Sequence, residues 1–582
     1  MLHTLTRSLR ENKGPALVTV LLSALEVVFE IVIPLYMSNL IDFGIEGGSM
    51  AAVWKFGAFL LLLAAFQLAT GVLAARIAAR ASVGFGANLR EDMYNNVQTF
   101  AFSNIDKFST ASIVTRLTTD TTNVQNAFQM LMRMAIRAPV MLIFSMIVSF
   151  RISHDISMTF LIILPILALA LFFIIRSVFP VFSRVFRTYD ELNNVVQENV
   201  RGIRVVKSFN QERHEIGKFG AISERIYKDF SKGERLITLN APLMQFCIYT
   251  CMIVISWLGA KAIIASGNDP ALGLTTGNLT ALITYTMQIL SSLMMLSMVF
   301  AMLTISLASA RRIAEVLEER SDIPQPEQPV MTVRDGAVDF DHVSFVYASK
   351  ADKKVLDDID LHIHSGETIG IIGGTGASKS SLVQLIPRLY DVTGGKLTLG
   401  GVDVRDYDLD TLRGAVAMVL QKNELFSGTI KENLRWGNEN ATDEELQHAC
   451  VLACADEFIS AMPDGYDTHI EQGGTNVSGG QKQRLCIARA LLKKPKVLIL
   501  DDSTSAVDTR TDAQIQQALS TYIPDTTKII IAQRISSVQN ADRIVVLDDG
   551  HIDAVGCHDE LLRTCEIYRE VYESQQKGGE DD

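Results

Sequence analysis

The sequence predicts a membrane domain of about six helices followed by a soluble α/β domain. Three observations support this fold class. The first half of the chain contains about six apolar runs that each reach the roughly 17 to 25 residues needed to cross a bilayer. A charged, proline-rich segment follows these runs. Beyond about residue 335, short apolar strands alternate with helices, which is typical of an α/β domain.

Length and composition exclude several classes of protein. The chain has 582 residues, of which 48% are hydrophobic and 20% charged, so it is neither a disordered chain nor a collagen-like fibre. Its net charge of −12 provides no basic field, and we expect no nucleic-acid partner. The seven cysteines show no C-x-x-C spacing, and the pairs that lie four residues apart favour helix packing over a metal site.

The membrane-crossing runs lie near residues 15–42, 51–79, 128–150, 156–180, 239–266 and 278–307. The first run follows basic residues but is too long for the core of a signal peptide, so we expect it to be a retained span. Lys and Arg are concentrated in the connections 80–127 and 181–238 and are absent from 43–50. This bias places both termini and the two long connections in the cytoplasm.

Helical periodicity continues through both long connections, so the spans should extend as helices beyond the membrane. We therefore expect a transmembrane domain at 1–312, a linker at 313–334, an α/β domain at 335–575 and an acidic tail at 576–582.

A phosphate-binding loop is predicted where the strand Thr368–Ile372 runs into Gly373–Ser380 and then an apolar helix. Backbone N–H groups would cradle phosphates, with Lys379 on the β and γ oxygens and Ser380 on Mg²⁺. The strand Val497–Asp501 ends in the carboxylate that a Mg²⁺–nucleotide site also needs. The candidate nucleotide-binding residues in the loop are Gly374, Thr375, Gly376, Ala377, Ser378, Lys379, Ser380 and Ser381.

The segment Asn476–Arg484 between these elements resembles the signature motif of ATP-binding cassette (ABC) proteins, with Val477 in place of the usual Leu. The whole chain resembles an ABC exporter half-transporter, which implies ATP and Mg²⁺ as cofactors and a bacterial inner-membrane location. In that family two nucleotide-binding domains close head to tail over ATP, so the resemblance implies an obligate dimer. Its implied ligands are Tyr347 on adenine, Gln421 and Asp501 on Mg²⁺, and Ser478, Gly479, Gly480 and Gln481 on the partner's ATP, with a D-loop at 505–508.

Three positions on the P-loop side depart from the family pattern. Asp502 stands where Glu normally polarises the attacking water, and its side chain is one methylene shorter, which retracts the base by roughly 1–1.5 Å. Gln533 stands at the switch position of His, where an amide donates a hydrogen bond but cannot become cationic. Ser378 replaces a loop glycine.

These departures predict a heterodimer in which this chain's own site binds ATP and hydrolyses it poorly. The partner chain would carry Glu and His at the matching positions, and this chain's intact signature would complete the partner's site. Three alternatives remain open: a homodimer with two slow sites, an ATP-sensing regulatory membrane subunit, and an importer on the exporter fold.

Candidate substrate residues lie in the first and sixth spans, and the family resemblance implies export of amphipathic or drug-like molecules. Glu26 and Glu30 share one helical face inside the membrane, where they would either attract cationic substrates or pair with bundle-facing polar groups. Met287, Met294 and Met298 form a polarizable stripe that suits varied apolar ligands, or ordinary helix packing.

The tips of the two long connections, Ser103–Thr110 and Gly202–Gln211, are candidate coupling helices that would dock on nucleotide-binding domains. Their mixed charge is equally that of a solvated face.

Overall fold

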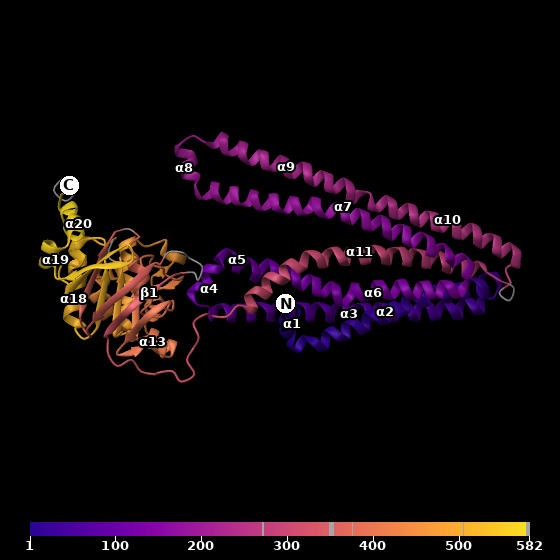
Figure 1. Cartoon of the computed structure of the whole chain (residues 1–582). Helices are drawn as coiled ribbons and strands as arrows, with labels where there is room; N and C mark the ends of the chain where they lie inside the picture. Colours follow the sequence, from indigo (N-terminus) through magenta and orange to yellow (C-terminus); the bar gives the residue numbers. More distant parts are fainter. Residues whose placement is uncertain (270–272, 348–353, 375, 504–505, 578–582) are drawn as a thin grey trace. The chain divides into compact units, whose positions relative to one another are not determined.

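The computed structural model describes residues 1–269, 273–347, 354–374, 376–503 and 506–577 (Figure 1). These residues form two compact units. The first unit comprises Met1–Gln98 and Thr110–Glu319, and the second comprises Thr99–Ser109 and Arg320–Asp582. The short segment Thr99–Ser109 thus packs with the C-terminal half although it lies between two long helices of the N-terminal half.

The first unit is built of long helices (Figure 1). Within the described residues, six helical segments are long and apolar enough to span a bilayer: Arg10–Glu46, Met50–Gln98, Thr110–Ile152, His154–Arg201, Glu212–Ser266 and Thr276–Glu318. The helices are α1 (Leu2–Arg7), α2 (Lys13–Asn39), α3 (Met50–Gln98), α5 (Thr110–Thr115), α6 (Thr121–Ile152), α7 (His154–Arg201), α8 (Ile203–Ser208), α9 (Glu212–Thr238), α10 (Asn240–Ser266) and α11 (Thr276–Glu318). The six predicted membrane helices are confirmed.

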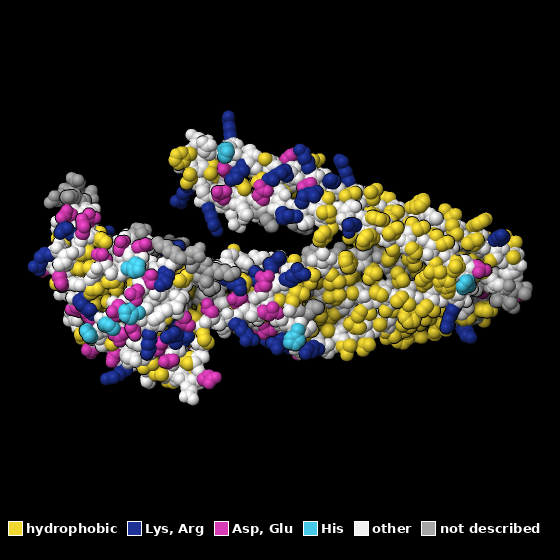
Figure 2. Space-filling view, viewed as in Figure 1, with side chains coloured by type: hydrophobic (Ala, Val, Ile, Leu, Met, Phe, Trp, Pro, Cys, Tyr) yellow, Lys and Arg dark blue, Asp and Glu magenta, His cyan; other side chains and the backbone are white. Residues whose placement is uncertain are grey.

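Apolar side chains on the outer faces of these helices explain why they belong in lipid. Leu61, Phe246 and Trp257 are each about two-thirds or more exposed, at 75%, 70% and 69%. Figure 2 shows such hydrophobic side chains gathered in a broad band over the long helices, with Lys and Arg concentrated on the parts of α7 and α9 outside the band. A band of this extent is unfavourable in water and favourable against acyl chains.

The helices are much longer than a bilayer is thick, as the periodicity predicted. Helix α3 has 49 residues, which at 1.5 Å per residue is about two and a half times the 30 Å hydrocarbon core. Beyond the apolar band α7 and α9 run side by side and are joined by ion pairs, including Arg225 to Glu191 at 2.6 Å and Lys218 to Glu198 at 3.2 Å. These ion pairs add to apolar contacts between the two helices, such as the edge contact of Phe182 with Phe230.

Two predicted boundaries differ from the structure. Helix α11 continues to Glu318, so residues 313–318, predicted as linker, are helical because Ile313 and Val316 bury an apolar face at 0% and 1% exposure. Helix α20 (Glu566–Lys577) includes the first two residues of the predicted tail, where Gln576 donates a hydrogen bond to Tyr572. The rest of the predicted tail lies outside the described residues.

The second unit contains two main sheets. A four-stranded sheet has the order β2-β1-β4-β5, and a six-stranded sheet has the order β12-β11-β3-β10-β9-β6. In the larger sheet the five strands from β11 to β6 are parallel, and β12 is antiparallel to β11 at the edge. The strands are β1 (Val338–Phe345), β2 (Leu356–Ile363), β3 (Thr368–Gly373), β4 (Gly394–Leu399), β5 (Val402–Asp403), β6 (Val416–Val419), β9 (Val497–Asp501), β10 (Thr527–Ile531), β11 (Arg543–Asp548) and β12 (His551–Gly556). Strands β7 (Gly428–Thr429) and β8 (His469–Ile470) form a small separate pair.

The parallel strands are mostly apolar, with polar residues at their ends, because both faces of their sheet are covered. Ile529 and Ile531 of β10 face the core shared with the four-stranded sheet, whereas Ile530 faces the core formed with the helices. The helices of this unit are α4 (Phe102–Lys107), α12 (Lys379–Gln384), α13 (Leu409–Ala415), α14 (Ile430–Arg435), α15 (Asp443–Leu452), α16 (Asp456–Ser460), α17 (Gly479–Leu492), α18 (Thr509–Tyr522), α19 (His558–Thr564) and α20. The carboxyl ends of β3, β9 and β10 meet at one edge, where the polar site residues lie.

Candidate nucleotide-binding site

The phosphate-binding loop joins β3 to the short helix α12 at the centre of the six-stranded sheet. Lys379, the first residue of α12, donates from Nζ to the carbonyl oxygens of Gly373 and Gly374, each at 2.8 Å. Adding a side chain at Gly374 or Gly376 would meet no atom within 4 Å, so the loop leaves open space above these two residues. Thr375 lies outside the described residues.

The two predicted magnesium ligands lie side by side. Ser380 donates from Oγ to Oδ1 of Asp501 at 3.1 Å, which brings the end of β9 to the start of α12. A hydroxyl and a carboxylate are hard oxygen ligands of the kind that Mg²⁺ prefers, so the donor set fits this ion. Asp501 is only 4% exposed, and burial raises the pKa of its carboxyl. Burial also lowers the pKa of Lys379.

Ser378 adopts a left-handed backbone conformation, with φ +67° and ψ 21°. This conformation is unfavourable for a residue with a Cβ atom and costs glycine nothing. The serine at this position therefore holds a conformation that favours glycine, which adds strain to the loop.

Tyr347, the predicted adenine-stacking residue, is fixed from two sides. Its hydroxyl hydrogen-bonds Ser381 Oγ at 2.7 Å, at the start of α12. Its ring makes an edge contact with Tyr390, with the centroids 5.1 Å apart and the planes at 90°. The side chain remains 44% exposed, which leaves ring surface for a base to cover.

The structure brings the three predicted catalytic residues together on a single carboxylate oxygen. Gln533 donates from Nε2 to Oδ2 of Asp502 at 2.8 Å, and Gln421 donates from Nε2 to the same oxygen at 3.3 Å. Asp502 follows β9 with φ +48°, and its N–H is bonded to the carbonyl oxygen of Ile531 at 2.9 Å. The side chain is thus held where β9 and β10 end together.

The signature segment forms the start of α17. Ser478 Oγ accepts from the N–H of Gln481 at 3.3 Å, and Gln481 Oε1 accepts from the N–H of Ser478 at 2.9 Å, which is a reciprocal capping box. A side chain on Gly480 would come within 2.8 Å of the carbonyl oxygen of Ala506, whereas one on Gly479 would meet Ala506 Cβ at 3.5 Å. Ser505 of the predicted D-loop lies outside the described residues.

The hydrogen bonds described for the signature residues reach several neighbours. They end within α17 and its cap, on the carbonyl oxygens of Gly473 and Cys454, and on the N–H of Ala506. The family resemblance predicts that this segment faces the P-loop of a partner chain.

The two acidic residues of the first span are paired. Arg137 of α6 donates from Nη1 to Oε1 of Glu26 and from Nη2 to Oε2 of Glu30, both at 2.6 Å. Gln288 of α11 donates to the carbonyl oxygen of Glu30 at 3.2 Å, so three helices share this polar cluster. The predicted span 128–150 contains two basic residues, Arg133 and Arg137, and an Arg inside a span was the available signal for this partner.

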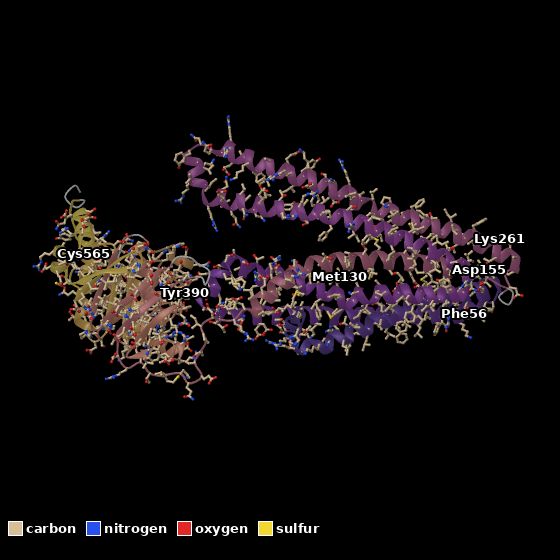
Figure 3. All side chains as sticks on the ribbon, viewed as in Figure 1. Phe56, Met130, Asp155, Lys261, Tyr390 and Cys565 are labelled. Atoms are coloured by element: carbon tan, nitrogen blue, oxygen red, sulfur yellow. The ribbon has the colours of Figure 1, made fainter. Side chains whose placement is uncertain are left out.

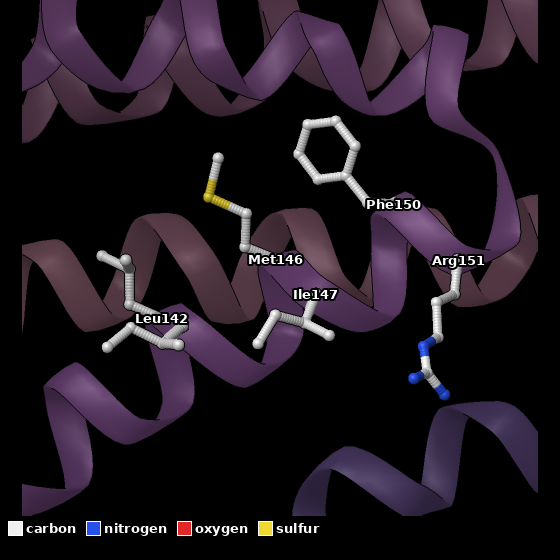
Figure 4. Close-up of a pocket in the computed structure, with 6 residues that line it drawn as sticks. Leu142, Met146, Ile147, Phe150 and Arg151 are labelled. Atoms are coloured by element: carbon white, nitrogen blue, oxygen red, sulfur yellow. The ribbon is translucent and has the colours of Figure 1, made fainter.

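The methionines of the predicted stripe all reach the surface of α11, with Met287, Met294 and Met298 exposed by 39%, 46% and 62%. A separate hollow of about 500 Å³ lies along α6 (Figure 4). Its lining is Leu142, Ile143, Met146, Ile147, Phe150 and Arg151, and it contains none of the predicted substrate residues. An almost entirely apolar lining of this kind suits an acyl chain.

Comparisons with known proteins agree with these two units. A profile of the ABC transporter transmembrane region matches residues 16–309, and an ABC transporter profile matches residues 356–505. The chain is 36% identical over 558 residues to the uncharacterized ABC transporter ATP-binding protein YfiB of Bacillus subtilis, covering 96% of each chain. It is 33% identical over 580 residues to the uncharacterized ABC transporter ATP-binding protein Rv1273c of Mycobacterium tuberculosis, covering 99% of this chain and 98% of the relative.

The fold is also similar to that of a bacterial Atm1-family ABC exporter solved with ATP bound. The TM-score is 0.80 at 24% sequence identity, over 97% of this chain and 98% of the exporter chain. Six membrane helices, a P-loop and a signature segment in one polypeptide agree with both matched profiles. The chain is therefore a multi-pass member of the ABC transporter family, an ATPase-coupled transporter that binds ATP with Mg²⁺.

Proposed function

We propose that this chain is one subunit of a heterodimeric ABC exporter whose own P-loop site binds ATP and hydrolyses it slowly. Its signature residues would complete a second site, at which the partner chain performs most of the hydrolysis. The observation that carries the proposal is the double amide contact on Asp502, in which Gln421 and Gln533 both donate to Oδ2.

Two amide hydrogen bonds occupy the oxygen through which Asp502 would act as a general base. They direct the lone pairs of Oδ2 toward Gln421 and Gln533 instead of toward a water molecule. The shorter side chain of Asp adds to this effect, because proton transfer in the transition state depends steeply on position.

Nucleotide binding depends mainly on other groups, although Gln421 is also a predicted Mg²⁺ ligand. Lys379 and the loop amides would hold the phosphates, Ser380 and Asp501 would hold Mg²⁺, and Tyr347 would cover the adenine. Bound Mg²⁺ would neutralise phosphate charge. A site with intact binding groups and a weak base would retain ATP for a long time and keep the two domains engaged while the partner's site turns over.

A homodimer with two slow sites is the main alternative, because Asp502 still provides a carboxylate. The decisive experiment compares ATP turnover of the purified complex after Asp502→Glu in this chain and after Glu→Gln at the matching position of the partner. We expect nearly all turnover to disappear only with the partner change. Vigorous hydrolysis by this chain alone would favour the homodimer.

The cargo that we propose is amphipathic and includes cations. Glu26, Glu30 and Arg137 together carry one net negative charge when all three are ionised, inside a membrane domain where unbalanced charge is costly. An amphipathic cation would balance this charge, and the exposed methionines of α11 offer adaptable apolar contact.

The cargo is tested by efflux of a cationic and a neutral amphipathic dye with Glu30→Gln. The substitution leaves the Glu26–Arg137 pair to hold α2 and α6 together. We expect the KM for the cationic dye alone to rise. The matched control is Glu46→Gln, at the end of the same span and paired with Asn268. Equal loss for both dyes would assign Glu30 a structural role, and uptake instead of efflux would indicate an importer.

An ATP-sensing regulatory subunit would bind ATP but would support neither efflux nor uptake of the dyes. Substrate-stimulated ATP hydrolysis in the complex therefore separates the exporter from this alternative.

A further inference from the structure

Helix α4 belongs to the second unit. Its contacts there include two hydrogen bonds to the segment that follows α11 and two contacts with Tyr390. Ser103 Oγ donates to Asp322 Oδ1 at 2.7 Å, and Asn104 Nδ2 donates to the carbonyl oxygen of Arg320 at 3.0 Å. These two bonds hold the helix to the backbone and side chains that follow α11. The other two contacts, from Phe102 and Asp106, both end on Tyr390.

Tyr390 lies in the turn between α12 and β4, inside the second unit (Figure 3). Its hydroxyl donates to Asp106 Oδ2 at 2.9 Å, and its ring contacts the ring of Phe102, with the centroids 6.0 Å apart. Burial and the bond to Asp106 raise the pKa of Tyr390, so the phenol remains a neutral donor at physiological pH.

The ring of Tyr390 also contacts the ring of Tyr347, the predicted adenine-stacking residue. Tyr390 makes the edge contact with Tyr347 at 5.1 Å and a tilted contact with the buried Phe345 at 5.6 Å. Phe345 also contacts Tyr347 at 4.8 Å. Three rings therefore pack against one another, and the orientation of Tyr347 depends on the position of Tyr390.

We propose that Tyr390 is a positioning residue that links the adenine-binding ring of Tyr347 to helix α4. This inference rests on the proposed role of Tyr347 in binding ATP. A base stacked on Tyr347 would restrict its ring, the edge contact would restrict Tyr390, and the hydroxyl of Tyr390 would then hold Asp106. Nucleotide occupancy would thus order α4, which the chain connects directly to the second and third membrane segments.

The link is tested in the purified full-length complex by two measurements with ATP and Mg²⁺. Photolabelling of this chain by azido-ATP reports nucleotide affinity, and amide hydrogen exchange in residues 99–109 reports the order of α4. We expect ATP to slow exchange in this segment. The expected protection is about 3- to 10-fold, the range of one aromatic pair.

Variants on the two sides of the link should behave differently. Asp106→Ala removes an exposed acceptor and should abolish the protection of residues 99–109 while azido-ATP labelling stays unchanged. Tyr390→Ala should abolish the protection and also weaken labelling by about 3- to 10-fold, because Tyr347 loses its edge contact. Tyr390→Phe retains the ring and should still lose the protection. Ile105→Ala, on the same helix, changes neither contact of Tyr390 and is the matched control.

Two results would overturn the inference. Labelling of the unmodified chain without any protection of residues 99–109, or full protection in Asp106→Ala, would show that α4 is ordered independently of Tyr390. Absence of labelling in the unmodified chain would refute the proposed nucleotide site itself, and the inference with it. A purely structural role of Tyr390 predicts that labelling and protection fall together in every variant.

Discussion

The P-loop half and the signature half of the nucleotide-binding unit differ in how closely they keep the pattern of their family. The signature half retains a capped helix start, with Ser478 and Gln481 bonded reciprocally. In the P-loop half Ser380 donates to Asp501, but Ser378 adopts a left-handed conformation and Asp502 lies under two amide donors. In the function proposed above, binding geometry and catalytic chemistry are separable, because the first depends mainly on the loop backbone and the second on side chains.

The largest effect is expected from the intact half. Gly480→Ala would place a Cβ within 2.8 Å of the carbonyl oxygen of Ala506 and shift the start of α17. Because the signature would serve the partner's hydrolytic site, ATP turnover of the complex should fall on the order of 10²-fold. The control is Gly414→Ala, where a Cβ meets no atom within 4 Å. Unchanged turnover would mean that the signature half does not contribute to hydrolysis.

Restoring the family residues on the P-loop half should make this chain's own site hydrolyse ATP faster. The double substitution Asp502→Glu with Gln533→His lengthens the base and removes one amide donor from its oxygen. Hydrolysis of ATP bound to this chain should rise by roughly 10- to 100-fold in single-turnover assays with the partner's site inactivated. Asp548→Glu, the same change at an exposed strand end, is the control. A flat response would place the cause of slow hydrolysis elsewhere.

Acid should affect only the P-loop half. Burial raises the pKa of Asp501, so in the folded protein its carboxylate takes up a proton at a higher pH than an ordinary Asp does. Mg²⁺ binds the ionised form, so affinity for ATP–Mg²⁺ should fall as pH is lowered through this raised pKa. Titration of azido-ATP labelling with and without Mg²⁺ measures the effect. Labelling without Mg²⁺ should not show this fall with decreasing pH. If the pH profiles with and without Mg²⁺ are identical, Asp501 is excluded as the group that titrates.

The smallest effects concern stability. Ser378→Gly relieves a left-handed residue and should stabilise the unit by about 0.5–1 kcal/mol. Ser478→Ala removes a helix cap and should destabilise it by about 1 kcal/mol. Thermal unfolding of the complex should show the two Tm shifts with opposite signs, each about 2–4 °C or less. Shifts of the same sign would contradict the contrast between a strained loop and a capped helix.

The sequence by itself determined the order and type of the main elements. Apolar runs of bilayer length fixed the six membrane helices, and the strand-to-glycine pattern before Lys379 fixed the phosphate loop, because both signals are local. The ends of helices are less well determined by local sequence, as α11 shows. The charged, proline-rich composition after residue 312 predicts a linker, but buried Ile313 and Val316 keep the chain helical as far as Glu318.

Only the tertiary structure decided which side chains meet. Gln421 and Gln533 are 81 and 31 residues from Asp502. They converge because β6 and β10 pair in parallel with β9 on its two sides and end at the same edge. Glu26 and Glu30 meet Arg137 more than 100 residues away because α2 packs against α6. Local patterns specify an element and its buried face, but contacts between distant residues depend on how strands pair and helices pack.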